Sequence, residues 1–246
     1  LGRQDHYSIM MENNNRYLEA CAAGERAGLY YTCINSFLTA DELAYILDNS
    51  ESQILITSMS KLEVAIDAVS QSSKVRKVLV VDADANELPD GFEDYATTCQ
   101  SFPATPIDNE RLGTSMLYSS GTTGRPKGII RPLPEQPPAD ALPMYDFLGQ
   151  LWHYREDMIY LSPAPLYHSA PQAAVNLTIR QGGTVIIMER FDPEAYLSLI
   201  EQYSVSHSQL VPTMFSRMLK LPEAVRKSYD LSSLEIAVHA AAPCPV

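Results

Sequence analysis

The sequence is short of basic residues and of long apolar runs, and each shortage excludes a class of protein. Its 246 residues hold 18 Lys and Arg against 30 Asp and Glu, which gives a formal net charge of −12. This balance argues against a nucleic-acid footprint and against adsorption to anionic membranes. No apolar run approaches the ~20 residues that a membrane-spanning helix needs, so no transmembrane segment is expected.

Paired cysteines are also missing. The four cysteines, Cys21, Cys33, Cys99 and Cys244, lie far apart, without a Cys-x-x-Cys pair and without histidines at metal-ligand spacing. We interpret them as thiols in a reducing compartment and predict no metal site among them. The first residues lack the basic segment and apolar core of a secretory leader. These features predict a cytoplasmic protein.

Short β-branched runs alternate with helical patterns along most of the chain. Strands are expected at 53–58, 77–82, 115–120, 158–163, 184–189 and 235–240. Several of these runs are apolar on both faces, as in parallel strands that helices cover. Strands and helices in this alternation predict right-handed crossovers. The expected fold class is α/β, with mostly parallel sheets covered by helices.

Local signals mark helix starts and connections. Thr39 and Glu42 form a capping box before an apolar face, and Asp192 followed by Pro193 is an N-cap with proline at the first helical position. The stretch 131–143 holds five prolines in thirteen residues, so an irregular connection is expected there. A composition shift at 101–113 predicts the connection between two α/β lobes, 1–112 and 113–246.

One short segment concentrates groups that bind phosphate. Tyr118–Gly128 has the sequence YSSGTTGRPKG. Its glycines, Gly121, Gly124 and Gly128, allow positive φ and let backbone N–H groups converge on an anion. Lys127 adds a full positive charge. Hydroxyl donors come from Ser119, Ser120, Thr122 and Thr123.

This segment is not a Walker loop. That motif needs Gly-Lys-Ser/Thr in direct sequence, whereas Arg125 and Pro126 separate Gly124 from Lys127. Composition alone would also fit a flexible Ser/Gly/Thr turn. The full eleven-residue string, however, resembles the phosphate-binding signature of the AMP-forming adenylating enzymes. This superfamily includes acyl-CoA synthetases, aryl-CoA ligases, firefly luciferase and the adenylation domains of peptide synthetases.

The resemblance extends over the whole chain. LSPAPLYHSAP at 161–171 is similar to the next motif of the family, in which an aromatic–His pair lines the carboxylate pocket. AVHAAAPCP at 237–245 is similar to a segment that flanks the nucleotide and acyl sites. The family more often has Gly-Gly where Ala240 and Ala241 stand, and these methyl groups narrow the approach of the backbone to a ligand. Residues 2–57 follow the first lobe of the family nearly residue by residue.

The resemblance implies roles for particular residues. The β- and γ-phosphates of ATP would be bound by Ser119, Ser120, Gly121, Thr122, Thr123, Gly124 and Lys127. The acyl pocket would be lined by Tyr167, His168, Ala240 and Ala241, with His168 as a wall or gate and not as an acid-base catalyst. No catalytic residue is assigned within this chain. The histidines without such context, expected on the surface or in the core, are His6, His153 and His207.

ATP, Mg²⁺ and coenzyme A are the cofactors that the resemblance implies, with a small-molecule carboxylic acid as the substrate. Family chains normally begin further upstream and continue into a Tyr-Gly-x-Thr-Glu motif, a ribose-binding aspartate and a small domain with a catalytic lysine. We therefore expect a piece of the N-terminal domain, truncated at both ends and inactive in adenylation by itself. Its exposed strand at 235–240 is expected to favour a homodimer.

The expected function of the parent protein is that of an ATP-dependent acyl-CoA synthetase. The stretch 170–183 has no acidic group to pair with the ammonium of an amino acid, which favours a fatty or alicyclic acid. The alternatives are an aryl-CoA ligase, a peptide-synthetase adenylation domain, or a folded fragment without catalytic activity.

Overall fold

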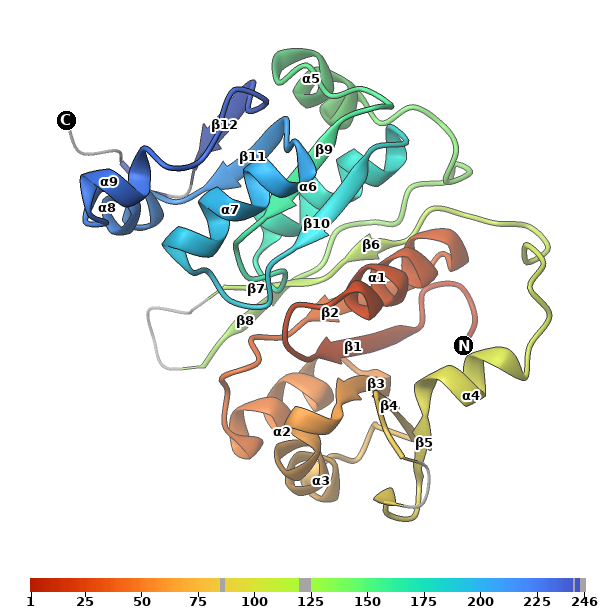
Figure 1. Cartoon of the computed structure of the whole chain (residues 1–246). Helices are drawn as coiled ribbons and strands as arrows, with labels where there is room; N and C mark the ends of the chain where they lie inside the picture. Colours follow the sequence, from red (N-terminus) through yellow and green to blue (C-terminus); the bar gives the residue numbers. More distant parts are fainter. Residues whose placement is uncertain (85–86, 120–124, 241, 244–246) are drawn as a thin grey trace. The chain divides into compact units, whose positions relative to one another are not determined.

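The computed structural model describes residues 1–84, 87–119, 125–240 and 242–243, which divide into two compact units (Figure 1). The first unit holds Leu1–Glu12 and Arg16–Asp140, and the second holds Asn13–Asn15 and Ala141–Val246. Both consist of helices packed on a mostly parallel sheet, which confirms the α/β class.

The first unit is built on a sheet whose described strands follow the order β5-β4-β3-β1-β2-β6, with every neighbouring pair parallel. Its strands are β1 His6–Met10, β2 Tyr30–Cys33, β3 Ser52–Ser58, β4 Lys77–Val81, β5 Phe92–Asp94 and β6 Thr114–Ser115. Its helices are α1 Asn15–Ala27, α2 Ala40–Asn49, the 3₁₀ turn η1 Met59–Lys61, α3 Leu62–Gln71 and α4 Tyr95–Gln100.

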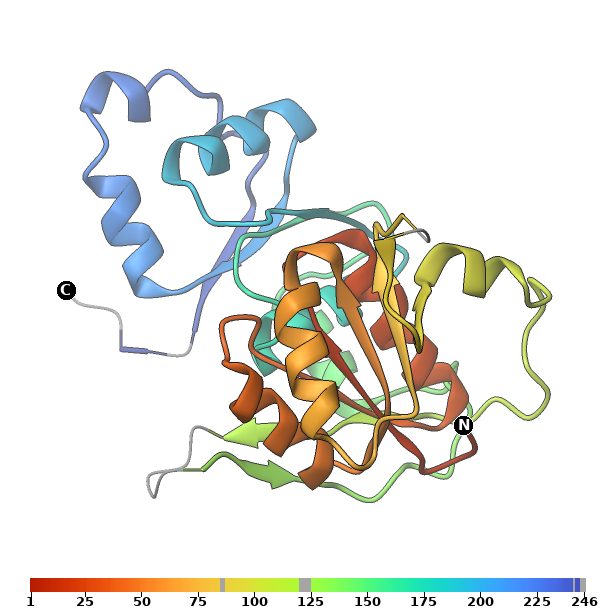
Figure 2. The same cartoon turned by 90° about the horizontal axis from the view of Figure 1, so that it is seen from below.

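Helices cover both faces of this sheet. On one face the backbone N–H of Gly24 in α1 donates to the hydroxyl of Tyr7 in β1 at 3.0 Å. On the other face Met10 of β1 packs in a buried cluster with Leu43 and Leu47 of α2 and with residues of α3. Figure 2 shows α2 and α3 side by side. Strands buried from both sides explain the apolar runs at β3 and β4.

Helix α2 begins at the predicted capping box. The Thr39 backbone N–H donates to Oε2 of Glu42 at 2.9 Å, and the Glu42 N–H donates to Oγ1 of Thr39 at 3.4 Å. These bonds satisfy two of the donors that a helix leaves free at its start. The prediction from the local sequence is confirmed.

The strand expected at 115–120 is split in two. β6 ends the parallel sheet at Ser115, and the chain continues into a separate antiparallel ribbon of β7 Leu117–Ser119 and β8 Lys127–Ile129. The phosphate segment therefore starts at the carboxyl end of a strand, as expected, but this strand belongs to the ribbon and not to the parallel sheet.

The division between the units falls later in the chain than the predicted lobe boundary at 112/113. β6 pairs with β2 in the register Tyr30↔Thr114, which keeps it in the first sheet. The proline-rich stretch is irregular, as predicted, and also belongs to the first unit. Tyr30 donates its hydroxyl to the carbonyl of Arg131 at 2.7 Å, and Arg3 donates to the carbonyl of Pro134 at 3.1 Å.

The second unit has a parallel sheet whose described strands follow the order β10-β9-β11-β12. Its strands are β9 Ile159–Ser162, β10 Thr184–Ile187, β11 His207–Leu210 and β12 Ile236–His239. Its helices are α5 Pro143–Leu151, α6 Ser169–Arg180, α7 Pro193–Tyr203, α8 Pro212–Leu219 and α9 Glu223–Arg226. α7 starts at the predicted cap, where Oδ1 of Asp192 accepts from the Glu194 and Ala195 N–H groups at 3.0 and 2.9 Å.

β11 is fully buried although its sequence, HSQL, is polar. Ser208 donates its hydroxyl to the carbonyl of Leu161 at 2.8 Å. Nε2 of His207 lies 3.0 Å from the carbonyl of Trp152, which only accepts, so this nitrogen carries the proton. Nδ1 then accepts from Ser206 at 2.8 Å. This strand was not among those expected from the sequence, and His207 proves to be a core residue.

Asn13 holds together two connections of the second unit, although the chain on both sides of Asn13–Asn15 belongs to the first. Its side-chain amide donates to the carbonyls of Ala164 and Met188 at 2.9 and 3.1 Å. Its Oδ1 accepts from the Leu166 N–H at 2.9 Å. Ala164 and Leu166 follow β9, and Met188 follows β10. One buried side chain thus satisfies three backbone groups.

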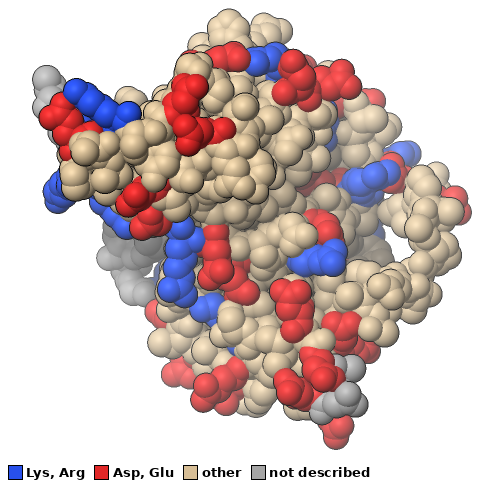
Figure 3. Space-filling view, in the orientation of Figure 1, with Lys and Arg blue, Asp and Glu red and all other residues tan. Residues whose placement is uncertain are grey.

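The surface of the described residues carries the expected acidic excess, spread over the face in view in Figure 3. None of the described helices combines the length and the apolar character needed to cross a membrane. β12 forms one edge of its sheet and alternates half-buried and exposed residues. The expected homodimer and the cytoplasmic location stay predictions.

Asn13→Ala is expected to lower the free energy of unfolding by about 2–4 kcal/mol, because it leaves buried backbone groups of Ala164, Leu166 and Met188 without their partner. Urea denaturation followed by circular dichroism measures this change. Asn35→Ala is the control, since its side chain accepts a local bond from the Phe37 N–H at 3.0 Å and, among the described residues, binds no distant backbone group. Equal losses in the two variants would contradict the assigned role of Asn13.

The protein is expected to lose stability as the pH falls below about 6.5, the ordinary pKa of histidine. Burial lowers the pKa of His6, His168 and His207 below that value. The unfolded chain therefore binds more protons than the folded chain in this range, and the free energy of unfolding decreases until the folded-state pKa values are passed. Urea titrations at pH 7.5, 6.5 and 5.5 test this. A stability that stays level or rises over this interval would contradict it.

Candidate functional site

The ribbon of β7 and β8 carries both ends of the predicted phosphate loop. Ser119, the last residue of β7, is in register with Lys127, the first residue of β8. The Lys127 side chain is exposed, and within the described part of the chain it forms no ion pair. An unneutralised ammonium at the end of a ribbon is suited to a polyanion. The predicted residues Ser120, Gly121, Thr122, Thr123 and Gly124 lie outside the described residues.

Gly128 is the one described glycine of the phosphate segment, and its φ is not positive. The described glycines with positive φ are Gly28, Gly91 and Gly182, whereas Gly128 lies in β8 opposite Tyr118. A Cβ at this position would lie 3.1 Å from Cζ and Oη of Tyr118 and closer still to Cε of Met116. A side chain at this position would therefore displace the Met116 side chain and crowd the Tyr118 ring, and Gly128 does not use the positive φ that glycine allows.

The predicted pocket pair lies between β9 and α6. The rings of Tyr167 and His168 have centroids 4.4 Å apart and are tilted by 52°. His168 is the N-cap residue of α6, where its backbone is extended. Part of its surface is exposed, but the surrounding protein displaces enough water to lower the imidazole pKa, so the ring is neutral at pH 7. Burial also raises the pKa of Tyr167. Neutral side chains are consistent with a pocket wall.

Asn13 is the residue near this pair that the sequence analysis missed. It binds the backbone at Ala164 and Leu166, immediately before Tyr167 and His168. The only local signal was a run of three asparagines after an apolar segment, and such a run also fits an ordinary turn. Its role depends on backbone groups about 150 residues away in the chain, at separations of 151 and 153.

Ala240 follows β12 and donates its N–H to the carbonyl of Leu210 at the end of β11, at 3.1 Å. β9, β11 and β12 are parallel, so Ala240 lies at the same sheet edge as the connection that carries Tyr167 and His168. The neighbouring residue Ala241 is outside the described residues. A single cavity lined by Tyr167, His168 and Ala240 stays a prediction.

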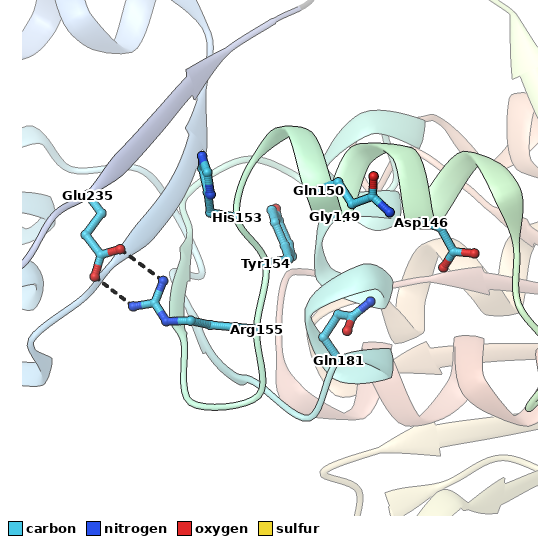
Figure 4. Close-up of a pocket in the computed structure, with 8 residues that line it drawn as sticks. All are labelled: Asp146, Gly149, Gln150, His153, Tyr154, Arg155, Gln181 and Glu235. Atoms are coloured by element: carbon cyan, nitrogen blue, oxygen red, sulfur yellow. Dashed lines mark hydrogen bonds and ion pairs between the residues drawn. The ribbon is translucent and has the colours of Figure 1, made fainter.

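A cavity of about 690 Å³ opens at the opposite edge of the same sheet (Figure 4). It is lined by Asp146, Gly149, Gln150, His153, Tyr154, Arg155, Gln181 and Glu235. Arg155 binds Glu235 through two bonds of 2.9 and 2.7 Å, which raises the pKa of Arg155 and lowers that of Glu235. The Arg155 cation is already paired with Glu235. In addition, ligands of open α/β sheets bind at the carboxyl ends of the strands, and this cavity lies at the amino ends. We therefore do not assign the predicted site to this cavity.

Metal ligands are not grouped in the part of the chain that the structure describes. No cluster of three or more His, Cys, Asp or Glu side chains there could hold an ion. We assign none of the described residues to Mg²⁺.

Proteins of known function are similar to this chain over nearly its whole length. Acyl-CoA synthetase 7 of Caenorhabditis elegans is 29% identical over 247 residues, which cover 98% of this chain and 45% of that protein. Feruloyl-CoA synthase of Amycolatopsis sp is 30% identical over 254 residues, with coverage of 98% and 45%. This chain thus spans less than half the length of these relatives.

The fold is shared with solved structures. The anthranilate CoA ligase AuaEII, in complex with anthranoyl-AMP, matches with a TM-score of 0.82 and 20% identity, over 100% of this chain and 47% of that one. At this identity the likeness shows the fold alone. The family described as AMP-binding enzyme matches residues 1–246. The chain belongs to the AMP-binding enzyme family.

Proposed function

We propose that the protein containing this chain is an AMP-forming acid–CoA ligase that uses ATP, a carboxylic acid and coenzyme A. The observation that carries the proposal is the exposed Lys127 at the start of β8, in a chain that belongs to the AMP-binding family throughout. Ser119–Gly124 and Lys127 bind the β- and γ-phosphates of ATP. The acid lies against Tyr167, His168, Ala240 and Ala241.

The chemistry has two steps. A carboxylate oxygen of the acid attacks the α-phosphorus of ATP, and the bond to the bridging oxygen breaks as pyrophosphate leaves with that electron pair. The thiol of coenzyme A then attacks the acyl carbonyl, losing its proton, and AMP leaves. Lys127 stabilises the negative charge that grows on the departing pyrophosphate. Tyr167 and His168 are neutral and orient the acid without exchanging protons with it.

The acid is proposed to be fatty or alicyclic. Helix α6, which follows directly after the Tyr167–His168 pair, contains no Asp or Glu. It offers no carboxylate to the ammonium of an amino acid, and such a buried charge would be costly without a partner. An aromatic acid is the alternative, because the relatives include both an acyl-CoA synthetase and a feruloyl-CoA synthase. Pyrophosphate release with fatty, alicyclic, aromatic and amino acids ranks these classes.

Lys127→Ala is expected to lower acid-dependent pyrophosphate release from ATP by about 10- to 100-fold, since a charge-assisted hydrogen bond is worth about 1.5–3 kcal/mol. The measurement is steady-state release in the protein that contains this chain, with the best acid of the panel.

Lys220→Ala serves as the matched control, because Lys220 is an exposed lysine at the end of α8 and should leave the rate unchanged. Full activity in Lys127→Ala, or an equal loss in the two variants, would contradict the role of Lys127.

A further inference from the structure

Helix α2 contacts strand β7 of the ribbon and the residue directly before β8. Asn49 accepts a hydrogen bond on Oδ1 from the hydroxyl of Tyr118, in β7, at 2.7 Å. Tyr45 donates its hydroxyl to the carbonyl of Pro126, directly before β8, at 3.1 Å. Tyr45 and Asn49 are four residues apart and therefore lie on one face of the helix. A single helix face thus holds the chain at β7 and at the entry to β8.

A third contact involves Arg125, just before Pro126. Its guanidinium lies 4.8 Å from the centroid of the Tyr45 ring, within the range of a cation–π interaction. Asp41 and Glu42, in the first turn of α2, line the same small cavity of about 170 Å³ as Arg125. Their negative charge favours this position of the guanidinium. The hydroxyl of Tyr45 therefore binds Pro126, while its ring contacts the guanidinium of the preceding residue, Arg125.

Helix α2 is a rigid support for these contacts. Its start is fixed by the capping box, and Leu43, Ile46 and Leu47 are buried in the core of the first unit. Tyr118 packs against the same buried cluster. The helix cannot shift without disturbing this core, because close-packed interiors resist displacement.

Two further features favour the hydrogen bond from Tyr118 to Asn49: the glycine opposite Tyr118 in β8 and the protonated state of the phenol. Gly128 leaves the space that the Tyr118 ring occupies. Burial, together with the nearby Tyr45, raises the pKa of Tyr118 to about 12. The phenol keeps its proton at neutral pH and stays a donor to Asn49.

We propose that Tyr45, Asn49 and Tyr118 are positioning residues for ATP: they fix the stem of the phosphate loop on the core, so that Lys127 meets the phosphates in one place. The inference rests on the proposed function, because it names what orients the same site. When the residues on both sides of the loop are already fixed in the free protein, less conformational entropy is lost on binding ATP. Weakening it should raise the KM for ATP more than it changes the KM for the acid.

The test uses Tyr118→Phe, Asn49→Leu, their double variant, Tyr45→Phe and Tyr45→Leu in the protein that contains this chain. Each loss of one hydrogen bond is expected to raise the KM for ATP about three- to tenfold, with the KM for the acid within about twofold of wild type. The double variant should match Tyr118→Phe, since both changes remove one bond. Tyr45→Leu should exceed Tyr45→Phe, because it also removes the ring beneath Arg125.

The matched control is Tyr229→Phe, which removes a tyrosine hydrogen bond to Glu194 of 3.1 Å in the second unit. It should leave the KM for ATP unchanged. A second readout is the Kd of a fluorescent N-methylanthraniloyl-ATP, displaced by ATP, which does not depend on turnover. The conservative phenylalanine variants keep the test available if Tyr45→Leu does not fold.

The outcomes separate the two proposals. Wild-type protein that binds the fluorescent nucleotide but releases no pyrophosphate with any acid would overturn the proposed function, and the Kd values would still test the positioning residues. An unchanged KM and Kd for nucleotide in Tyr45→Leu and Tyr118→Phe would overturn the inference alone. Equal rises in the KM for ATP and for the acid would also overturn it, because they indicate general disruption of the fold. Absence of nucleotide binding in the wild type would overturn both.

Discussion

Every described pair of neighbouring strands in the two main sheets is parallel, and this constraint decides where the chain can present functional groups. Parallel strands need a crossover between them, so their carboxyl ends open into connections at the same edge. In the second unit that edge carries Tyr167 and His168 after β9 and Ala240 after β12. In the first unit the chain leaves the parallel sheet after β6 and forms the ribbon β7–β8. The ribbon gives the phosphate segment two supported ends.

Connections between strands and helices contain backbone N–H and C=O groups that lack partners in regular secondary structure. Side chains from distant parts of the chain form hydrogen bonds with some of these groups. Asn13 satisfies three backbone groups around β9 and β10. Tyr45 satisfies the carbonyl of Pro126 beside β8, from a helix whose other face is in the core. In both places an amide or hydroxyl on a well-packed segment binds backbone groups that lie outside regular secondary structure. These backbone groups are therefore paired by side chains anchored in the cores.

The sequence predicted best those features that depend on neighbouring residues. The capping box of α2 and the aspartate cap of α7 are confirmed, and β3, β4, β9, β10 and β12 lie where strands were expected. β11 was missed because His207 and Ser208 are polar, and only their partners at Trp152 and Leu161 make burial possible. Gly128 does not use the positive φ that glycine allows, and a Cβ there would instead meet the side chains of Met116 and Tyr118.

The sequence by itself determined the α/β class, the starts of α2 and α7 and the family resemblance, because periodicity, capping and motifs are encoded within short stretches. Only the tertiary structure decided which distant residues meet. It brings Cys21 and Cys33 to a sulfur–sulfur distance of 3.8 Å, with no motif to suggest it. It likewise places Asn49 against Tyr118 across a separation of 69 residues. Such contacts follow from the order of the strands and the faces that the helices cover, and no short stretch of sequence specifies either.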